Sequence, residues 1–366
     1  MKPARALAAT LWSLACCAGA TDVEPQRLQA PPAAAPTAAA TIAPATADAA
    51  RPASAHLEPD DRLGDLLDHP ALAGNARLLL PRNDVEVDRR TRIGDFAALL
   101  PYHTQVDAHD IVAGLNRLID DAAAGRAVFI DLYTPAEKAR DSTKADTGLF
   151  FLRGRAGAPF AVIAPGGGFS YVATVHEGLP YALAINRHGL NAFVLRYRVG
   201  QGAAAASEDL AAALSTIFRR AAALQVGTDG HSLWGSSAGA RMAAAIGSHG
   251  TARFGGDALP RPAAVVMAYT GHTDTSADEP PTFVVVGEHD RIAPPPVMQR
   301  RLRVLRQAGV TVAYREVPGL GHGFGAGTGT AAQGWIDDAV RFWQRAAGAA
   351  SAPTSPPERG AAAPRS

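Results

Sequence analysis

Short apolar runs alternate with helical stretches between residues 160 and 346, and this pattern constrains the fold most strongly. The uninterrupted apolar run over residues 160–164 is typical of a strand that is covered on both faces. Strands that alternate with helices predict an α/β fold, with a mostly parallel, doubly wound sheet and helices on both faces. In such a sheet, reactive side chains gather at the carboxyl ends of the strands.

The expected elements can be assigned along the chain. Residues 128–133 and 149–153 are expected to form an antiparallel pair at the start of the sheet. Ser207 is the expected N-cap of a long helix, with Asp209 in its first turn. The remaining strands are expected at 160–164, 192–197, 231–234, 264–269, 283–286 and 310–317, and the helices at 179–188, 207–224, 240–246, 297–308 and 334–346.

The start of the chain predicts export. Lys2 and Arg5 precede a short apolar stretch that ends in an A-x-A-like cleavage site, which predicts a signal peptide over residues 1–20. The stretch is too short for a permanent membrane span, so we expect a secreted or periplasmic protein. A lipoprotein acylated at Cys16 or Cys17 is the alternative, although the residues before either cysteine fit it poorly.

The rest of the chain divides by composition. Residues 21–55 and 348–366 are rich in Ala and Pro, which predicts a disordered linker and a disordered tail. Residues 56–125 predict a mainly helical extension that packs on the core and roofs its cleft, with Asp110 capping a helix over 111–124. The α/β domain is expected over 126–347, and the net charge of +1 gives no reason to expect a nucleic-acid partner.

Ser237 stands at the centre of a G-x-S-x-G sequence, between a strand-like run and a helical run. In that context the two glycines permit a sharp turn that lifts a serine hydroxyl clear of the sheet. Asp290 follows the expected strand 283–286, where a carboxylate can orient a histidine. Asp274 and Glu288 remain alternatives for the acid, because they lie in neighbouring loops.

His322 lies between glycines after the expected strand 310–317, and neutral imidazole suits a general base near pH 7. Only His322 completes the order Ser, Asp, His; its rivals are His176, His272 and His289. Three glycines at 166–168 follow a buried strand, and the backbone N–H groups of Gly167, Gly168 and Ala238 are the expected donors to an oxyanion.

Other polar residues carry two interpretations each. Phe169, Tyr171, His176 and Glu177 follow the glycine run and either line a cleft or pack in an ordinary loop. Arg196 and Arg198 either bind a substrate anion or, more often in proteins, pair with Glu208 and Asp209. His103, Asp107 and His109 match no known spacing of metal ligands, so no metal is expected.

Five motifs resemble those of bacterial acetylxylan-esterase-like enzymes of the α/β-hydrolase superfamily. They are Pro-Gly-Gly-Gly-Phe at 165–169, Phe-Val-Leu-Arg-Tyr-Arg at 193–198, Leu-Trp-Gly-Ser-Ser-Ala-Gly-Ala-Arg at 233–241, Gly-Glu-His-Asp at 287–290 and Gly-His-Gly-Phe at 321–324. The resemblance covers residues 128–346. It implies an α/β-hydrolase fold, a carboxylic ester substrate, no cofactor, and Ser237, Asp290 and His322 as the triad.

Two features depart from related groups. Pro165 stands where hormone-sensitive-lipase-like esterases usually carry His, and the short stretch from Ser237 to Asp290 leaves no room for the large lid of an interfacial lipase. We therefore expect a serine carboxylesterase that acts on small acyl esters such as acetylated carbohydrate. A peptidase, a lactone hydrolase and a non-catalytic carbohydrate- or partner-binding scaffold are the alternatives.

Overall fold

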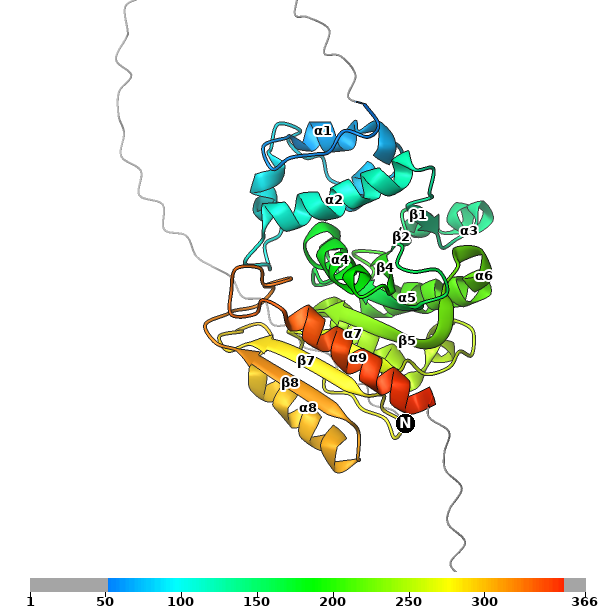
Figure 1. The fold of residues 1–366 in the computed structure, drawn as a ribbon, viewed down its shortest axis with the longest axis vertical. Helices are drawn as coiled ribbons and strands as arrows, with labels where there is room; N and C mark the ends of the chain where they lie inside the picture. The colour runs from blue at the N-terminus through cyan, green and yellow to red at the C-terminus, as the bar shows by residue number, and fades with distance from the viewer. Residues whose placement is uncertain (1–51, 352–366) are drawn as a thin grey trace, which may run out of the picture. The chain divides into compact units, whose positions relative to one another are not determined.

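The computed structural model describes residues 52–351 of the chain (Figure 1). The predicted signal peptide, most of the predicted linker and most of the predicted tail lie outside the described residues. None of the helices between residues 52 and 351 is long and apolar enough to cross a membrane.

The described residues form an eight-stranded sheet in the order β1-β2-β4-β3-β5-β6-β7-β8. Strands β3 to β8 pair in parallel, and β1 and β2 form the predicted antiparallel start. The strands are β1 (Phe129–Asp131), β2 (Gly148–Leu152), β3 (Pro159–Ala164), β4 (Asn191–Arg196), β5 (Gly227–Ser236), β6 (Ala264–Ala268), β7 (Thr282–Gly287) and β8 (Val312–Val317). The predicted mostly parallel α/β sheet is confirmed.

Helices cover both faces of this sheet because the side chains of each central strand alternate between two cores. In β3, Ile163 packs in one core with Trp335 of α9, whereas Val162 packs in the other core with Leu214 of α5. Figure 1 shows α9 crossing one face of the sheet and α8 lying behind β7 and β8. The helices of the sheet region are α3 (Pro135–Arg140), α4 (Leu179–Arg187), α5 (Gly202–Arg219), α6 (Ala221–Leu224), α7 (Ala238–His249), α8 (Pro295–Gln307) and α9 (Trp335–Ser351).

The region before β1 is mainly helical and shares a core with the sheet. Gly114 of α2 packs so closely on Leu179 of α4 that a Cβ added at the glycine would lie 2.6 Å from the leucine Cβ. Leu57 and Leu115 belong to the same buried cluster as Ile163. This region contains α1 (Leu63–Leu67), α2 (Ala108–Ala123) and three short 3₁₀ helices, η1 (Pro70–Leu72), η2 (Ala76–Leu79) and η3 (Ile93–Leu99).

Two predicted helix starts are wrong. Helix α2 begins after Asp107, whose carboxylate accepts the backbone N–H groups of His109 and Asp110, so Asp110 is not the N-cap. Helix α5 begins at Gly202, well before the predicted N-cap Ser207, which is buried inside the helix. The alanines before Ser207 are strong helix formers and extend the helix toward its N-terminus.

Candidate active site

Ser237 lies in a sharp turn between β5 and α7. Its backbone has φ 50° and ψ −114°, a conformation that side-chain-bearing residues rarely adopt. The turn is possible only with glycine on both sides, since a Cβ at Gly235 would lie 2.4 Å from the backbone of Gly239 and one at Gly239 would lie 1.9 Å from the oxygen of Ala164. The backbone N–H of Ser237 donates to Ala268 at 2.9 Å, which ties the turn to β6.

The structure joins Ser237, His322 and Asp290 in one hydrogen-bonded chain. The Ser237 hydroxyl lies 2.9 Å from His322 Nε2, and His322 Nδ1 lies 2.8 Å from Asp290 Oδ2. Since a carboxylate only accepts, Nδ1 carries the proton and Nε2 accepts from the serine. The other oxygen of Asp290 accepts the backbone N–H groups of Ile292 at 2.9 Å and Ala293 at 2.7 Å. Asp290 is buried, so both of its oxygens are fixed.

The two alternative acids, Asp274 and Glu288, have partners other than His322. The carboxylate of Asp274 is paired with His249 at 2.6 Å, and Glu288 is exposed and accepts the backbone N–H of Gly319. The sequence order Ser, Asp, His thus corresponds to the residues that meet in space.

The rival histidines also have other surroundings. His176 is buried and its Nε2 donates to the oxygen of Gly323 at 3.0 Å. His289 faces Glu288 on the surface. Burial lowers the pKa of His272 to about 4, with Arg301 adding to the effect.

The glycine run lies against the nucleophile. A Cβ added at Gly166 would be 3.1 Å from Ser237 Cβ, and Gly167 and Gly168 have φ of +129° and +63°, which favour glycine. Within residues 52–351, none of the hydrogen bonds uses the backbone N–H of Gly167, Gly168 or Ala238. We call residues 165–169 the glycine loop.

Arg196 and Arg198 both bind groups of the protein itself. Arg198 donates from its backbone and its Nε to the buried carboxylate of Asp209, and its guanidinium also bonds Glu208. Arg196 is buried and donates to the backbone oxygens of Leu80 and Pro81. The interpretation of Arg198 as a partner of Glu208 and Asp209 is therefore confirmed, whereas Arg196 binds neither of them.

Phe169 ends the glycine loop, and Tyr171, His176 and Glu177 follow it; the sequence leaves open whether these four residues line a cleft or pack in the structure. His176 and Glu177 are buried, and Glu177 accepts the backbone N–H of Gly166 in the glycine loop. The Phe169 ring packs edge-on against Tyr197 at 6.3 Å. Tyr171 lines a cavity.

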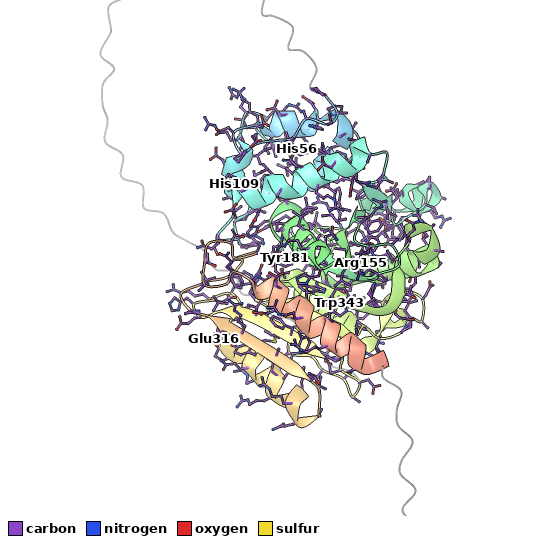
Figure 2. The ribbon with its side chains drawn as sticks, viewed as in Figure 1. His56, His109, Arg155, Tyr181, Glu316 and Trp343 are labelled. Carbon is purple, nitrogen blue, oxygen red and sulfur yellow. The ribbon has the colours of Figure 1, made fainter. Side chains whose placement is uncertain are left out.

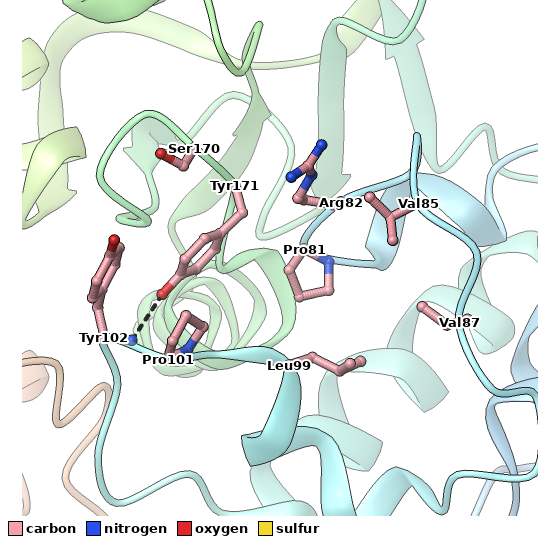
Figure 3. A pocket seen from close by; sticks show the side chains of 9 residues that line it. All are labelled: Pro81, Arg82, Val85, Val87, Leu99, Pro101, Tyr102, Ser170 and Tyr171. Carbon is pink, nitrogen blue, oxygen red and sulfur yellow. Dashed lines mark hydrogen bonds between the residues drawn. The ribbon is translucent and has the colours of Figure 1, made fainter. Parts of the chain in front are cut away.

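This cavity, of about 340 Å³, lies beside the glycine loop (Figure 3). The rings of Tyr102 and Tyr171 stack at 5.7 Å with 18° between their planes, and a Cβ at Gly168 would lie 3.3 Å from the Tyr102 ring. The N-terminal region supplies most of the wall. The lining residues are Pro81, Arg82, Val85, Val87, Leu99, Pro101, Tyr102, Ser170 and Tyr171.

Two residues near the site were not predicted to belong to it. His103 lies between Glu177 and Tyr171, at 2.9 Å from each, and Tyr269 donates its hydroxyl to Glu177 at 2.7 Å. Burial and the Glu177 carboxylate raise the pKa of Tyr269 well above its ordinary value, so it stays a donor. The sequence signal for both residues is weak: the spacing around His103 matches no metal site, and Tyr269 is only the end of an expected strand.

Comparisons with known proteins agree with this fold. The model of the prolyl oligopeptidase family matches residues 264–350, and no curated protein sequence matches the chain. An acetyl ester-xyloside bifunctional hydrolase from Caldicellulosiruptor lactoaceticus has 22% identity and a TM-score of 0.52, over 59% of this chain and 95% of that one. An α/β hydrolase from a Medee basin deep-sea metagenome library has 25% identity and a TM-score of 0.48, over 55% and 93%.

A carboxylesterase from Lactobacillus plantarum has 22% identity and a TM-score of 0.47, over 54% of this chain and 92% of that one. Of these three likenesses, the one to the acetyl ester-xyloside bifunctional hydrolase has a TM-score above 0.5, and it shows the fold and not the substrate. The chain has the α/β-hydrolase fold, and at the carboxyl edge of its sheet it carries a serine, a histidine and an aspartate in the hydrogen-bonded order that serine hydrolases use.

Proposed function

We propose that this protein is a serine carboxylesterase that hydrolyses short acyl esters, with Ser237, His322 and Asp290 as its triad. The single observation that carries the proposal is the chain of hydrogen bonds from the Ser237 hydroxyl through His322 to Asp290. A serine hydroxyl is a weak nucleophile by itself, and an oriented neutral imidazole activates it.

In the proposed first step, the Ser237 hydroxyl attacks the ester carbonyl and His322 Nε2 takes its proton. Asp290 holds the imidazole in the correct tautomer and stabilises the imidazolium that forms. The carbonyl oxygen becomes negative and accepts the backbone N–H groups of Gly167, Gly168 and Ala238. One such donor contributes about 3–4 kcal/mol of transition-state stabilisation.

The tetrahedral intermediate then collapses. The C–O bond to the alcohol breaks, and the alcohol leaves with the proton from His322. Water attacks the resulting acyl-enzyme with His322 as base, and the acid leaves as Ser237 regains its proton. The acyl-enzyme route requires no cofactor.

The surface beside the glycine loop supports a carbohydrate alcohol as part of the substrate. Tyr102 is 47% exposed and stacks on Tyr171 next to Gly168. Flat aromatic faces bind the C–H face of sugar rings, and concave sites lined by apolar groups with few polar ones are typical of small-molecule binding. We propose acetylated carbohydrate as the natural substrate class.

Export of the enzyme, as a secreted or periplasmic protein, remains a prediction from residues 1–20.

Peptide hydrolysis is the second candidate, because the matching family model describes peptidases. The two reactions separate when p-nitrophenyl acetate is compared with acetyl p-nitroanilide, which differ only in the bond cleaved. We expect the ester alone to be turned over, with kcat/KM falling as the acyl chain lengthens from acetate to octanoate. Release of acetate from acetylated xylo-oligosaccharides supports the carbohydrate class. Faster cleavage of the anilide, or of prolyl peptides, contradicts an esterase.

A further inference from the structure

A fully buried carboxylate lies directly behind the glycine loop. Glu177 belongs to the π-helical turn η5 (Thr174–Gly178) that leads into α4, and its side chain is 0% exposed. One carboxylate oxygen accepts the backbone N–H of Gly166. The other accepts from His103 Nε2 at 2.9 Å and from the Tyr269 hydroxyl at 2.7 Å. Three donors from three distant segments thus converge on one side chain.

The two side-chain donors, His103 and Tyr269, are each held by a further hydrogen bond. The Tyr171 hydroxyl lies 2.9 Å from His103 Nδ1, and the backbone N–H of Tyr102 donates to that hydroxyl at 3.2 Å. The Tyr269 oxygen accepts the backbone N–H of Gly325 at 3.2 Å, and its ring packs on His322 at 5.2 Å. The network therefore connects the N-terminal region, the end of β6 and the loop after β8 that carries His322 and Gly325.

Tyr181 extends the network to the nucleophile strand. The Ser236 hydroxyl donates to the Tyr181 hydroxyl at 3.1 Å, which lies 2.9 Å from that of Tyr269. Figure 2 labels Tyr181 on α4, and its ring packs edge-on against Trp335 of α9 at 5.0 Å. Ser236 directly precedes Ser237 in the sequence.

Gly166 is the point where this network meets the reacting groups. A Cβ added there would lie 2.9 Å from the Glu177 carboxylate and 3.1 Å from Ser237 Cβ. The two residues that follow, Gly167 and Gly168, carry the proposed oxyanion donors. A shift of about 1 Å in such donors is enough to reduce catalysis strongly.

The charge state fits a fixed acceptor. Burial alone would raise the pKa of Glu177, but the interaction with His103 and the hydrogen bonds from His103 and Tyr269 lower it to about 2. The side chain is therefore a carboxylate at neutral pH. A buried carboxylate is costly unless all of its partners are in place, so it enforces one arrangement of the groups that donate to it.

We propose that Glu177 is a positioning residue that fixes the glycine loop for oxyanion binding. In this proposal His103 of the N-terminal region holds the Glu177 carboxylate in place through its hydrogen bond. The inference rests on the proposed esterase function and extends it. The N-terminal region then completes the reacting site through His103.

The test is Glu177→Gln, measured on p-nitrophenyl acetate. An amide has one acceptor oxygen, so either Gly166 or the pair His103 and Tyr269 loses its acceptor. We expect kcat to fall about 100-fold with KM changed less than about threefold, since the interaction acts in the transition state. Affinity for a trifluoromethyl ketone, which forms an oxyanion on Ser237, falls in parallel with kcat/KM.

Glu316→Gln is the matched control, since Glu316 is an exposed carboxylate on β8 that accepts hydrogen bonds from Gln299 and Tyr314. It retains wild-type kcat. Exhaustive labelling with a fluorophosphonate counts the folded sites of each variant, so that loss of folded protein is not scored as loss of kcat.

If Glu177→Gln does not fold, two variants of His103 test the inference instead. His103→Gln keeps a donor near the position of Nε2, whereas His103→Ala removes it. We expect the alanine variant to lose kcat about 10-fold or more and the glutamine variant to recover most of it.

The inference is overturned by folded Glu177→Gln with kcat within about threefold of wild type, or by kcat loss without loss of ketone affinity. In the histidine pair, equal kcat for both variants overturns it. A wild type that neither hydrolyses the ester nor reacts with the fluorophosphonate contradicts the esterase function itself, whereas an active wild type with an equally active Glu177→Gln contradicts only the role of Glu177.

Discussion

In the proposed reaction Asp290 acts through His322. Its carboxylate accepts one hydrogen bond from His322 Nδ1. In Asp290→Asn the amide favours the wrong imidazole tautomer, and we expect kcat on p-nitrophenyl acetate to fall by about 10⁴-fold. Asp274→Asn, which removes the exposed partner of His249, is expected to keep kcat within about twofold. The reverse ranking would move the acid to the loop after β6.

His231 makes stability depend on pH. It is buried against Phe160 and Phe218, and burial lowers its pKa to about 4 from an ordinary 6.5. The unfolded chain therefore binds more protons between these values, so the free energy of unfolding is retained above pH 6.5 and is lost as pH falls toward 4.

Between pH 7 and pH 5 the free energy of unfolding falls in both the wild type and His231→Gln. We expect the fall to be about 1–2 kcal/mol smaller in His231→Gln, which lacks the buried imidazole. Urea unfolding followed by tryptophan fluorescence measures both drops. Equal drops for the two proteins would mean that His231 is protonated in the folded state.

Individual residues differ in how far the sequence reveals them. Ser237, Asp290 and His322 each follow a strand, and parallel strands bring their carboxyl ends to one edge, so the sequence predicted that they meet. Glu177 and His103 follow no such rule. Their contact joins a turn before α4 to a loop of the N-terminal region, and only the packed structure brings those segments together.

At the scale of elements, the turn between β5 and α7 depends on Gly239. A Cβ there would lie 1.9 Å from the oxygen of Ala164, a backbone atom of β3 that cannot move aside. We expect Gly239→Ala to lower the free energy of unfolding by about 3 kcal/mol or more. Gly348→Ala, in α9 with nothing near the added Cβ, is expected to raise it slightly. Thermal unfolding of both variants checks this, and a stable Gly239→Ala would contradict the close packing of the turn.

The limits of β3, β6 and β7 were predicted to within one residue, whereas β5 (Gly227–Ser236) is longer than the expected 231–234. Uninterrupted apolar runs such as that of β7 are bounded by polar or turn residues, so their limits are clear in the sequence. The start of α5 was wrong because Ser207 has the chemistry of a cap while the alanines before it continue the helix. The sequence does not predict the short α3 or the π-helical turn η5, since neither is long enough to show a hydrophobic period.

At the scale of the whole molecule, the N-terminal region and the sheet share one core. Leu115 of α2 is fully buried, and we expect Leu115→Ala to lower the free energy of unfolding by about 2–5 kcal/mol. The loss should be visible in the fluorescence of Trp234, Trp335 and Trp343, which lie in the sheet region, because the two parts unfold together. Val304→Ala, at a half-exposed position, is the control and changes it by less than about 0.5 kcal/mol.

An unchanged tryptophan transition in Leu115→Ala, with a separate earlier loss of helix by circular dichroism, would contradict a shared core.

Composition predicted a helical region that packs on the sheet, but it did not predict that this region would supply His103 and Tyr102 beside the glycine loop. That placement depends on the order of strands and on the packing of α2 against α4, which no local pattern encodes.

The most direct measurement is to react the purified protein with a fluorophosphonate and to identify the modified residue by peptide mass spectrometry. The account predicts a single phosphonylated residue, Ser237, with labelling abolished in Ser237→Ala and strongly slowed in His322→Ala. Absence of labelling in the wild type, or undiminished labelling of Ser237→Ala at another serine, would contradict it.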